Sequence, residues 1–341
     1  MSSHSSPLGE FGLIQRFFKT GADSMRENSD QAITLNIGDD CAPINPPFDQ
    51  EIAITSDMLV ESRHFFVDAD PALLGRKALA VNLSDLAAMG AKPLGFTLAI
   101  ALPTVDETWL EEFSKGLFAT AKECSCPLIG DDVTAGPFTI SITAFGAIPH
   151  GKAIRRSGAK PHEDIWVSGT VGDARLALAA LRHEINLNSN DLEQIQHRMH
   201  QPTPRINLGI LLRDVASAAL DISDGLLGDL GHILHQSQVD AEIHIDLIPK
   251  STTLRKQDAL IQNQFATCGG DDYEICFTAP SNQCERIRAI SESLNLPLTL
   301  IGKTLPKKDI QEKIYLLDTL GNPLSDVDAK PFLKSFDPFA S

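Results

Sequence analysis

Apolar residues cover nearly every face of a helix drawn over residues 70–93, which predicts one long buried helix. Asp70 can cap its N-terminus, and Pro71 suits the first helical position because its missing N–H costs nothing there. Gly90 follows the last apolar residues as a stop signal, and Pro93 prevents the helix from restarting. The pattern therefore predicts a buried helix with defined ends.

Asp85 interrupts this apolar pattern on the helix face that carries Val81 and Met89. An ionised carboxylate in such a place costs several kcal/mol, as an order of magnitude, unless a positive group meets it. A salt bridge or a capping contact is one interpretation, and a metal ion at the floor of a site is the other. The number of further carboxylates in comparable positions favours the metal.

The apolar patterns elsewhere predict an α/β chain in two parts. In the first part we expect helices at 10–19, 70–93 and 106–124 and strands at 34–37, 51–56, 94–102 and 138–148. In the second part we expect helices at 172–184, 191–200, 204–219, 224–235 and 281–294 and strands at 165–170, 220–222, 241–246, 273–279, 298–301 and 313–318. Residues 149–164 are rich in Gly, Pro and basic residues, so we place a boundary there, with domains at 1–150 and 151–341.

Composition narrows the possible partners. The chain has 341 residues and a formal net charge of −16, which argues against nucleic acid and anionic membranes. No apolar run approaches the roughly 20 residues of a membrane helix. The first residues lack the pattern of a secretory signal, and the six cysteines form no CxxC pair. We therefore expect reduced thiols and a cytoplasmic protein.

Aspartates recur where apolar strands end or helices begin. The groups are Asp39 with Asp40, Asp57, Asp131 with Asp132, Asp221 with Asp224, and Asp271 with Asp272. One such aspartate is usually a turn former or a helix cap. Because strand ends of an open α/β sheet meet at a crevice, five groups and Asp85 predict one anionic pocket. Oxygen ligands suit Mg²⁺, often shared with phosphate, and Thr55 and Ser56 could add neutral ligands.

Groups that could hold phosphate accompany these aspartates. Glycines that would let the backbone approach a ligand are Gly38, Gly130, Gly225, Gly269 and Gly270. Residues 223–225 open a predicted helix, and helix N-termini favour anions. Arg155 and Arg156 form either a phosphate clamp or a solvated basic linker. The stretch GAIPHGKA at 146–153 lacks the hydroxyl residue and the following helix of a P-loop, so we exclude that motif.

The ordered motifs resemble the thiamine-monophosphate kinase family, within the superfamily of aminoimidazole ribonucleotide synthetase. They are GEFGLI, IGDDCA, TSDMLVESRHF, KALAVNLSDLAAMGAKP, LIGDD, RRSGAKP, QPTPRI, DISDGLLGDLGHI and GGDDYEICF. The similarity covers nearly the whole chain. SDLAAMGA and DISDGL recur across the superfamily, whereas the HF after the TSD segment and GGDDYE are closer to the kinase.

This resemblance implies a fold and a set of roles. The family has an N-terminal mixed sheet with helices that forms a homodimer and a C-terminal α/β domain that completes the ATP and substrate site. Implied Mg²⁺ ligands are Asp40, Thr55, Ser56, Asp57, Asp85, Asp132, Asp221 and Asp224. Implied ATP contacts are Asp131, Asp132, Arg156 and Ser223. Implied contacts to thiamine phosphate are His64, Asp271 and Phe336.

This chain departs from the family pattern at several of these places. Asp131 stands where Gly is usual and adds charge beside the nucleotide. Ala135 replaces a commonly basic residue, and Asp271 is one methylene shorter than the usual Glu. Phe336 replaces a larger or hydroxylated aromatic and keeps a face for stacking on the cationic thiazolium.

The resemblance implies ATP-dependent conversion of thiamine monophosphate to thiamine diphosphate, with ATP as co-substrate and several Mg²⁺ ions as cofactors. A phosphate monoester has a second pKa near about 6 and is its own nucleophile, so we assign no general base. Mg²⁺ would reduce the repulsion between the two anionic reactants. The alternatives are another ATP-using enzyme of the superfamily, such as a selenophosphate synthetase, and a non-enzymatic Ca²⁺- or Mg²⁺-binding protein. No EF-hand spacing supports the latter.

Overall fold

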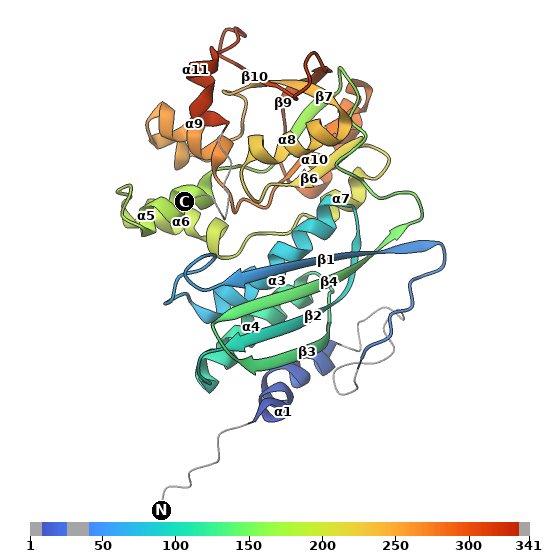
Figure 1. Cartoon of the computed structure of the whole chain (residues 1–341), viewed down its shortest axis with the longest axis vertical. Coiled ribbons are helices and arrows are strands. Elements are labelled where there is room, and N and C mark those ends of the chain that lie inside the picture. The colour runs from blue at the N-terminus through green and yellow to red at the C-terminus, as the bar shows by residue number, and fades with distance from the viewer. Residues whose placement is uncertain (1–8, 26–40, 334–341) are drawn as a thin grey trace, which may run out of the picture. The chain divides into compact units, whose positions relative to one another are not determined.

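The computed structural model describes residues 9–25 and 41–333. Within them the chain forms two compact units (Figure 1). The first contains the described residues up to Leu86 together with residues 92–150, and the second contains residues 87–91 and those from Gly151 onward. Among the described residues, helices are too short or too polar to cross a lipid bilayer. All six cysteines carry free thiols.

The first unit is built on a four-stranded mixed sheet in the order β1-β4-β2-β3. Its strands are β1 (Gln50–Val60), β2 (Lys92–Leu102), β3 (Leu128–Ala135) and β4 (Thr139–Pro149). β4 pairs antiparallel with β1 and β2, whereas β2 and β3 are parallel. The predicted mixed sheet is confirmed. The strand predicted at 34–37 lies outside the described residues.

Helices α3 (Pro71–Ala88) and α4 (Glu107–Glu123) lie behind this sheet in Figure 1. The predicted caps are present: Asp70 accepts a hydrogen bond from the Leu73 N–H, and Asp106 accepts from Thr108 and Trp109. Residues 10–25 form one helical segment with widened turns in the middle, made of α1 (Glu10–Leu13), η1 (Ile14–Lys19) and α2 (Thr20–Met25). It contacts β3 and α4.

Asp57, Asp131 and Asp132 do not stand at strand ends, which corrects the sequence-based expectation for these three aspartates. Asp57 lies within β1, and Asp131 and Asp132 lie within β3. Successive side chains of a strand point to opposite faces. Cross-strand pairing links Asp57 through Ile142 and Leu98 to Asp131, so these side chains face the helices. Ser56 and Asp132 therefore face the other side of the sheet.

The second unit holds a six-stranded sheet in the order β10-β7-β9-β5-β8-β6. The strands are β5 (Asp164–Ser168), β6 (Ala218–Asp221), β7 (Val239–His244), β8 (Ile275–Ala279), β9 (Leu298–Pro306) and β10 (Ile314–Leu317). The longer helices are α5 (Asp173–Leu181), α6 (Ser189–His200), α7 (Ile206–Leu212), α8 (Leu226–Ser237), α9 (Ala259–Cys268) and α10 (Cys284–Leu294). Shorter helical turns are η3 (Leu254–Lys256), η4 (Ser281–Gln283), α11 (Asp326–Ala329) and η5 (Lys330–Phe332).

Only β7 and β10 are parallel in this sheet, so the expectation of a crevice at the carboxyl ends of parallel strands does not apply to it. One face of the sheet buries Trp166 and Phe277, which stack on each other, under α7 and α10. The helix predicted at 204–219 is wrong beyond Leu212, because Arg213 is extended and Asp214 has a φ of 62°. β6 then begins at Ala218.

Candidate functional site

In the first unit, β1 and α3 bring Thr55, Asp57 and Asp85 together. The Thr55 hydroxyl donates a hydrogen bond to the Asp85 carboxylate. The backbone N–H of Asp57 donates to Oδ1 of the buried Asn82 at 3.1 Å. Three residues predicted as metal ligands thus form one group, and Asn82 joins β1 to the helix beside it.

Burial and, as the smaller cause, the nearby Asp85 carboxylate raise the pKa of the Asp57 carboxyl to about 6. Two carboxylates that repel each other provide a favourable place for a cation. No group of three or more His, Cys, Asp or Glu side chains gathers tightly in the described part of the chain. Mg²⁺ commonly binds through one or two carboxylates and completes its shell with water and phosphate oxygens, so this pair and the Thr55 hydroxyl fit it.

Two other residues predicted near this group have separate local contacts. Ser56 points to the opposite face of β1, where its hydroxyl lies 3.0 Å from that of Thr143. The Nδ1 of His64 accepts a hydrogen bond of 3.0 Å from the Val60 N–H. That bond closes a tight turn after β1 and leaves the ring proton on Nε2.

Asp131 and Asp132 occupy the opposite edge strand of the sheet, three strand spacings or roughly 14 Å from β1. Burial, Asp132 and Glu10 raise the pKa of Asp131 to about 6, whereas Lys19 lowers it. Its Oδ2 is buried without a hydrogen-bond partner among the described residues. Asp132 is exposed on the other face. One copy of the chain therefore does not bring Asp132 to Asp57, so the single pocket predicted from the sequence does not form from these two residues of one copy.

In the second unit, the loop that precedes α8 is held by Asp229. The Asp229 carboxylate accepts hydrogen bonds from the N–H groups of Ser223, Asp224 and Gly225 at 3.0, 3.0 and 3.1 Å. The sequence analysis predicted that these N–H groups, at the start of a helix, would bind a phosphate. The buried carboxylate of Asp229 already uses them, so the loop presents the side chains of Ser223 and Asp224 instead.

A second loop, residues 269–273, packs backbone to backbone against the first. The Asp271 N–H donates to the Ser223 carbonyl and the Tyr273 N–H to the Ile222 carbonyl, both at 2.8 Å. A Cβ on Gly270 would lie 2.4 Å from the Ser223 carbonyl oxygen. The glycine thus permits contact between the two loops rather than the approach of a ligand. Burial and the neighbouring Asp271 carboxylate raise the pKa of Asp224.

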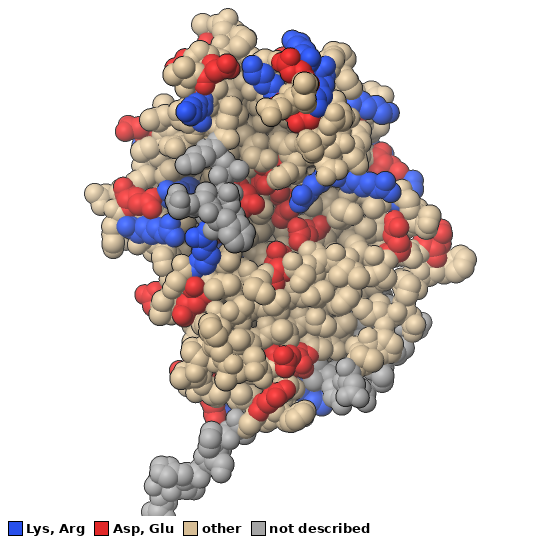
Figure 2. Space-filling view, viewed as in Figure 1, with Lys and Arg blue, Asp and Glu red and all other residues tan. Residues whose placement is uncertain are grey.

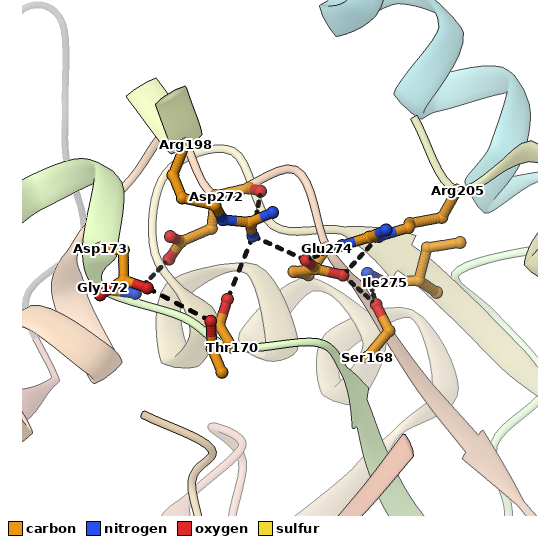
Figure 3. Close-up of polar contacts among 9 residues, drawn as sticks. All are labelled: Ser168, Thr170, Gly172, Asp173, Arg198, Arg205, Asp272, Glu274 and Ile275. Atoms are coloured by element: carbon orange, nitrogen blue, oxygen red, sulfur yellow. Dashed lines mark hydrogen bonds and ion pairs between the residues drawn. The ribbon is translucent and has the colours of Figure 1, made fainter. Parts of the chain in front are cut away.

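Behind this second loop lies a buried network of charged residues (Figure 3). Glu274 is fully buried and binds both Arg198 and Arg205. The Ser168 hydroxyl also donates to its carboxylate. Asp272 accepts a hydrogen bond of 2.8 Å from the Gly172 N–H, and burial raises its pKa well above the usual range.

The remaining predicted residues are dispersed or not described. Asp40 and Phe336 lie outside the described residues. Asp221 is buried at the end of β6, and Arg156 is exposed before β5. The network of Arg198, Arg205 and Glu274 was not predicted, although QPTPRI and GGDDYE contain two of its members.

Family models match both units. Residues 38–148 match the AIR synthase related protein N-terminal domain, and residues 160–314 match the corresponding C-terminal domain. The thiamine-monophosphate kinase of Salmonella typhimurium is 46% identical over 86% of this chain and 90% of its own. The chain belongs to the thiamine-monophosphate kinase family.

Solved members of this family have the same fold. Thiamine-monophosphate kinase from Stenotrophomonas maltophilia is 42% identical, with a TM-score of 0.82 over 90% of this chain and 96% of its own. AaThiL complexed with AMPPCP and TMP is 27% identical, with a TM-score of 0.72 over 95% and 98% of the two chains. The thiamine-monophosphate kinase fold therefore extends through both units.

Proposed function

We propose that this protein transfers the γ-phosphoryl group of ATP to the phosphate of thiamine monophosphate, which gives ADP and thiamine diphosphate. Identity of 46% to a thiamine-monophosphate kinase over most of both chains is the observation that carries this proposal. The complex of AaThiL with AMPPCP, an ATP analogue, and TMP supports the same pair of substrates. The protein is thus an enzyme of the kinase class.

The acidic residues act in this proposal as ligands of Mg²⁺ and not as proton carriers. The proposed ligands are Asp40, Thr55, Ser56, Asp57, Asp85, Asp132, Asp221 and Asp224. The repulsion between Asp57 and Asp85 supports a cation in the first unit, and that between Asp224 and Asp271 supports one in the second. Bound Mg²⁺ would neutralise charge on the transferred phosphoryl group.

The substrate contacts follow the same motifs. We assign ATP to Asp131, Asp132, Arg156 and Ser223, and thiamine monophosphate to His64, Asp271 and Phe336. The phosphate of the acceptor is largely dianionic at neutral pH and is itself the nucleophile. A catalytic base is therefore unnecessary, and the chain's work is to hold two anionic groups in line. The carboxylate of Asp271 suits the cationic thiazolium of the acceptor.

We further propose a homodimer formed through the uncovered face of the first unit's sheet. Ile54 and Met58 on that face are 65% and 57% exposed, and Figure 2 shows few charged side chains over the sheet. Exposed apolar area of this kind is typical of an interface. Asp132 lies on this same face, so its side chain could contact a second copy of the chain that packs there. The proposed Mg²⁺ ligands of one copy, which include Ser56 on this face, would then be joined by Asp132 of the partner subunit.

A direct assay tests the activity. The full chain is incubated with ATP, Mg²⁺ and thiamine monophosphate, and thiamine diphosphate and ADP are measured. We expect equal amounts of the two products and none when free thiamine replaces the monophosphate. Formation of thiamine diphosphate from free thiamine, or ADP without thiamine diphosphate, would contradict the proposed acceptor.

A further inference from the structure

The loop of residues 269–273 carries Asp271 in a backbone conformation that needs support. Asp271 and Tyr273 have φ values of 67° and 49°, in the left-handed region that residues other than Gly, Asn and Asp rarely adopt. Two such residues within one short loop persist only where the surroundings determine the backbone fully. The hydrogen bonds from the Asp271 and Tyr273 N–H groups supply part of that support on the side of Ser223.

The support on the other side comes from Arg198, on α6. One guanidinium nitrogen of Arg198 donates to the Asp272 carbonyl at 3.3 Å, to the Thr170 carbonyl at 3.2 Å and to the Glu274 carboxylate at 2.6 Å. Arg198 therefore contacts the loop backbone itself and the residue that follows the loop. Figure 3 shows its guanidinium between Asp272 and Glu274.

Glu274 fixes the end of the loop to the sheet. Arg205 grips its carboxylate through two nitrogens, and Ser168 donates to Oε2 while accepting from the Ile275 N–H. A Cβ on Gly169, which has a φ of 59°, would lie 2.3 Å from the carboxylate. The fully buried Glu274 carboxylate is thus surrounded by the chain's own groups.

We propose that Arg198 is a positioning residue, which holds residues 269–273 so that Asp271 faces the cationic ring of the phosphate acceptor. This inference rests on the proposed function, because it takes Asp271 as an acceptor contact. Arg198 itself touches neither substrate in this account. It acts through the Asp272 carbonyl and Glu274.

The two loops share two backbone hydrogen bonds, but each also has an anchor of its own, which makes the effect selective. Asp229 holds residues 223–225 through three backbone N–H groups, whereas Arg198 donates hydrogen bonds to Thr170, Asp272 and Glu274. Loss of Arg198 should therefore move Asp271 while Ser223 stays in place. The acceptor would bind less well, whereas ATP binding would change little.

The experiment compares Arg198→Met and Arg198→Lys with the wild-type chain. Arg288→Met serves as the matched control, because Arg288 also binds one glutamate but lies exposed on α10. Steady-state kinetics give KM for thiamine monophosphate and for ATP separately. Amide hydrogen exchange at Asp271 and Tyr273 reports the conformation of the loop without any substrate.

We expect Arg198→Met to raise KM for thiamine monophosphate by roughly 10- to 100-fold, as small misplacements of a binding group do, and to leave KM for ATP unchanged. Exchange at the two amides should accelerate. Arg198→Lys keeps the charge but loses the planar fork, so its values should lie between those of wild type and Arg198→Met. The Arg288→Met control should match wild type.

The inference is overturned if Arg198→Met lowers the melting temperature yet leaves both KM values and the exchange of the loop unchanged. If that variant does not fold, Arg198→Lys decides by the same measurements. A wild-type chain that forms no thiamine diphosphate would refute the proposed function alone. Unchanged exchange in the Arg198 variants would refute the positioning role whatever the activity.

Discussion

Two carboxylates, one partly buried in the first unit and one fully buried in the second, have opposite surroundings. Asp57 in the first unit faces another carboxylate, Asp85, and its pKa is raised to about 6. Glu274 in the second unit is more deeply buried but is gripped by Arg198 and Arg205. The first has charge that a ligand could neutralise, and the second has charge that the protein neutralises by itself.

This difference is the one expected between a proposed binding site and a structural support. Burying a carboxylate beside a second one costs free energy, which a fold tolerates where a bound cation recovers it. Burying a carboxylate between arginines fixes the positions of the chain segments that carry them. Acidic residues alone thus do not indicate where a cation binds. The charge of the residues around each carboxylate is the more informative feature.

The largest effect, a loss of kcat, should follow from substitutions at Asp57 and Asp85. Asp57→Asn and Asp85→Asn each remove a proposed Mg²⁺ ligand and the charge that attracts it. We expect either variant to lower kcat at ordinary Mg²⁺ by about 100-fold or more, with the fold intact by circular dichroism. Near-normal turnover in either variant would show that this pair does not hold the metal.

Mixed dimers test where Asp132 acts. If each site uses Asp57 of one copy and Asp132 of the partner subunit, a dimer of one Asp57→Asn and one Asp132→Asn chain retains one complete site. Co-expressed and purified mixed dimers should then be active, although each homodimer is inactive. Inactive mixed dimers would show that Asp132 of the partner subunit does not complete the site.

Glu274, whose charge is neutralised by two arginines, should contribute strongly to the free energy of unfolding. Glu274→Gln leaves two arginines without their partner, and breaking a buried pair in this way costs about 3–5 kcal/mol. Urea unfolding followed by tryptophan fluorescence measures the loss, since Trp166 lies in the core of this unit. A change within about 0.5 kcal/mol, the usual range for surface substitutions, would mean that the network contributes little.

In contrast to Glu274, the ionised Asp57 carboxylate should lower the stability of the folded state when no metal is present. Its folded pKa of about 6 lies above the ordinary aspartate pKa of 3.8, so between these pH values the folded state binds more protons than the unfolded state. Stability should therefore fall as pH rises from about 4 to 6 and remain lower above it. In EDTA, Asp57→Asn should be more stable than wild type by about 1–3 kcal/mol at pH 8 and equal at pH 4. A destabilised variant at pH 8 would contradict this cause of the shift.

The smallest effect on the free energy of unfolding is expected from a substitution in a surface ion pair. Arg288 and Glu285 form an ion pair whose side chains are 64% and 84% exposed. Replacing Arg288 by Met should change the free energy of unfolding by less than about 1 kcal/mol. A larger loss would weaken its use as the neutral reference for Arg198.

Local signals made much of the fold predictable. The ends of α3 follow from Asp70, Pro71 and Gly90, and Asp106 caps α4 as its sequence indicates, because these contacts join residues two to four apart. The strand register cannot be obtained in this way. A shift by one residue exchanges the faces, so the sequence could not separate Asp57 from Ser56 or Asp131 from Asp132.

The site itself was predicted in part. Thr55, Asp57 and Asp85 meet as expected, because β1 lies on the face of α3 that carries the one acidic residue of its apolar run. The network around Glu274 was missed because Arg198 lies 76 residues before it in the chain, and no local pattern links the two. The helix expected at 204–219 ended early because Asp214 adopts a left-handed conformation within an otherwise helical pattern.

Equilibrium binding of Mg²⁺ in the presence of AMPPCP tests the contrast between the two carboxylates most directly. Isothermal titration should show Mg²⁺ binding to wild type and Arg198→Lys and a strongly weakened affinity in Asp57→Asn and Asp85→Asn. If the Asp57 and Asp85 variants bind Mg²⁺ as tightly as wild type, this pair is not the metal site, and the account of the first unit is wrong.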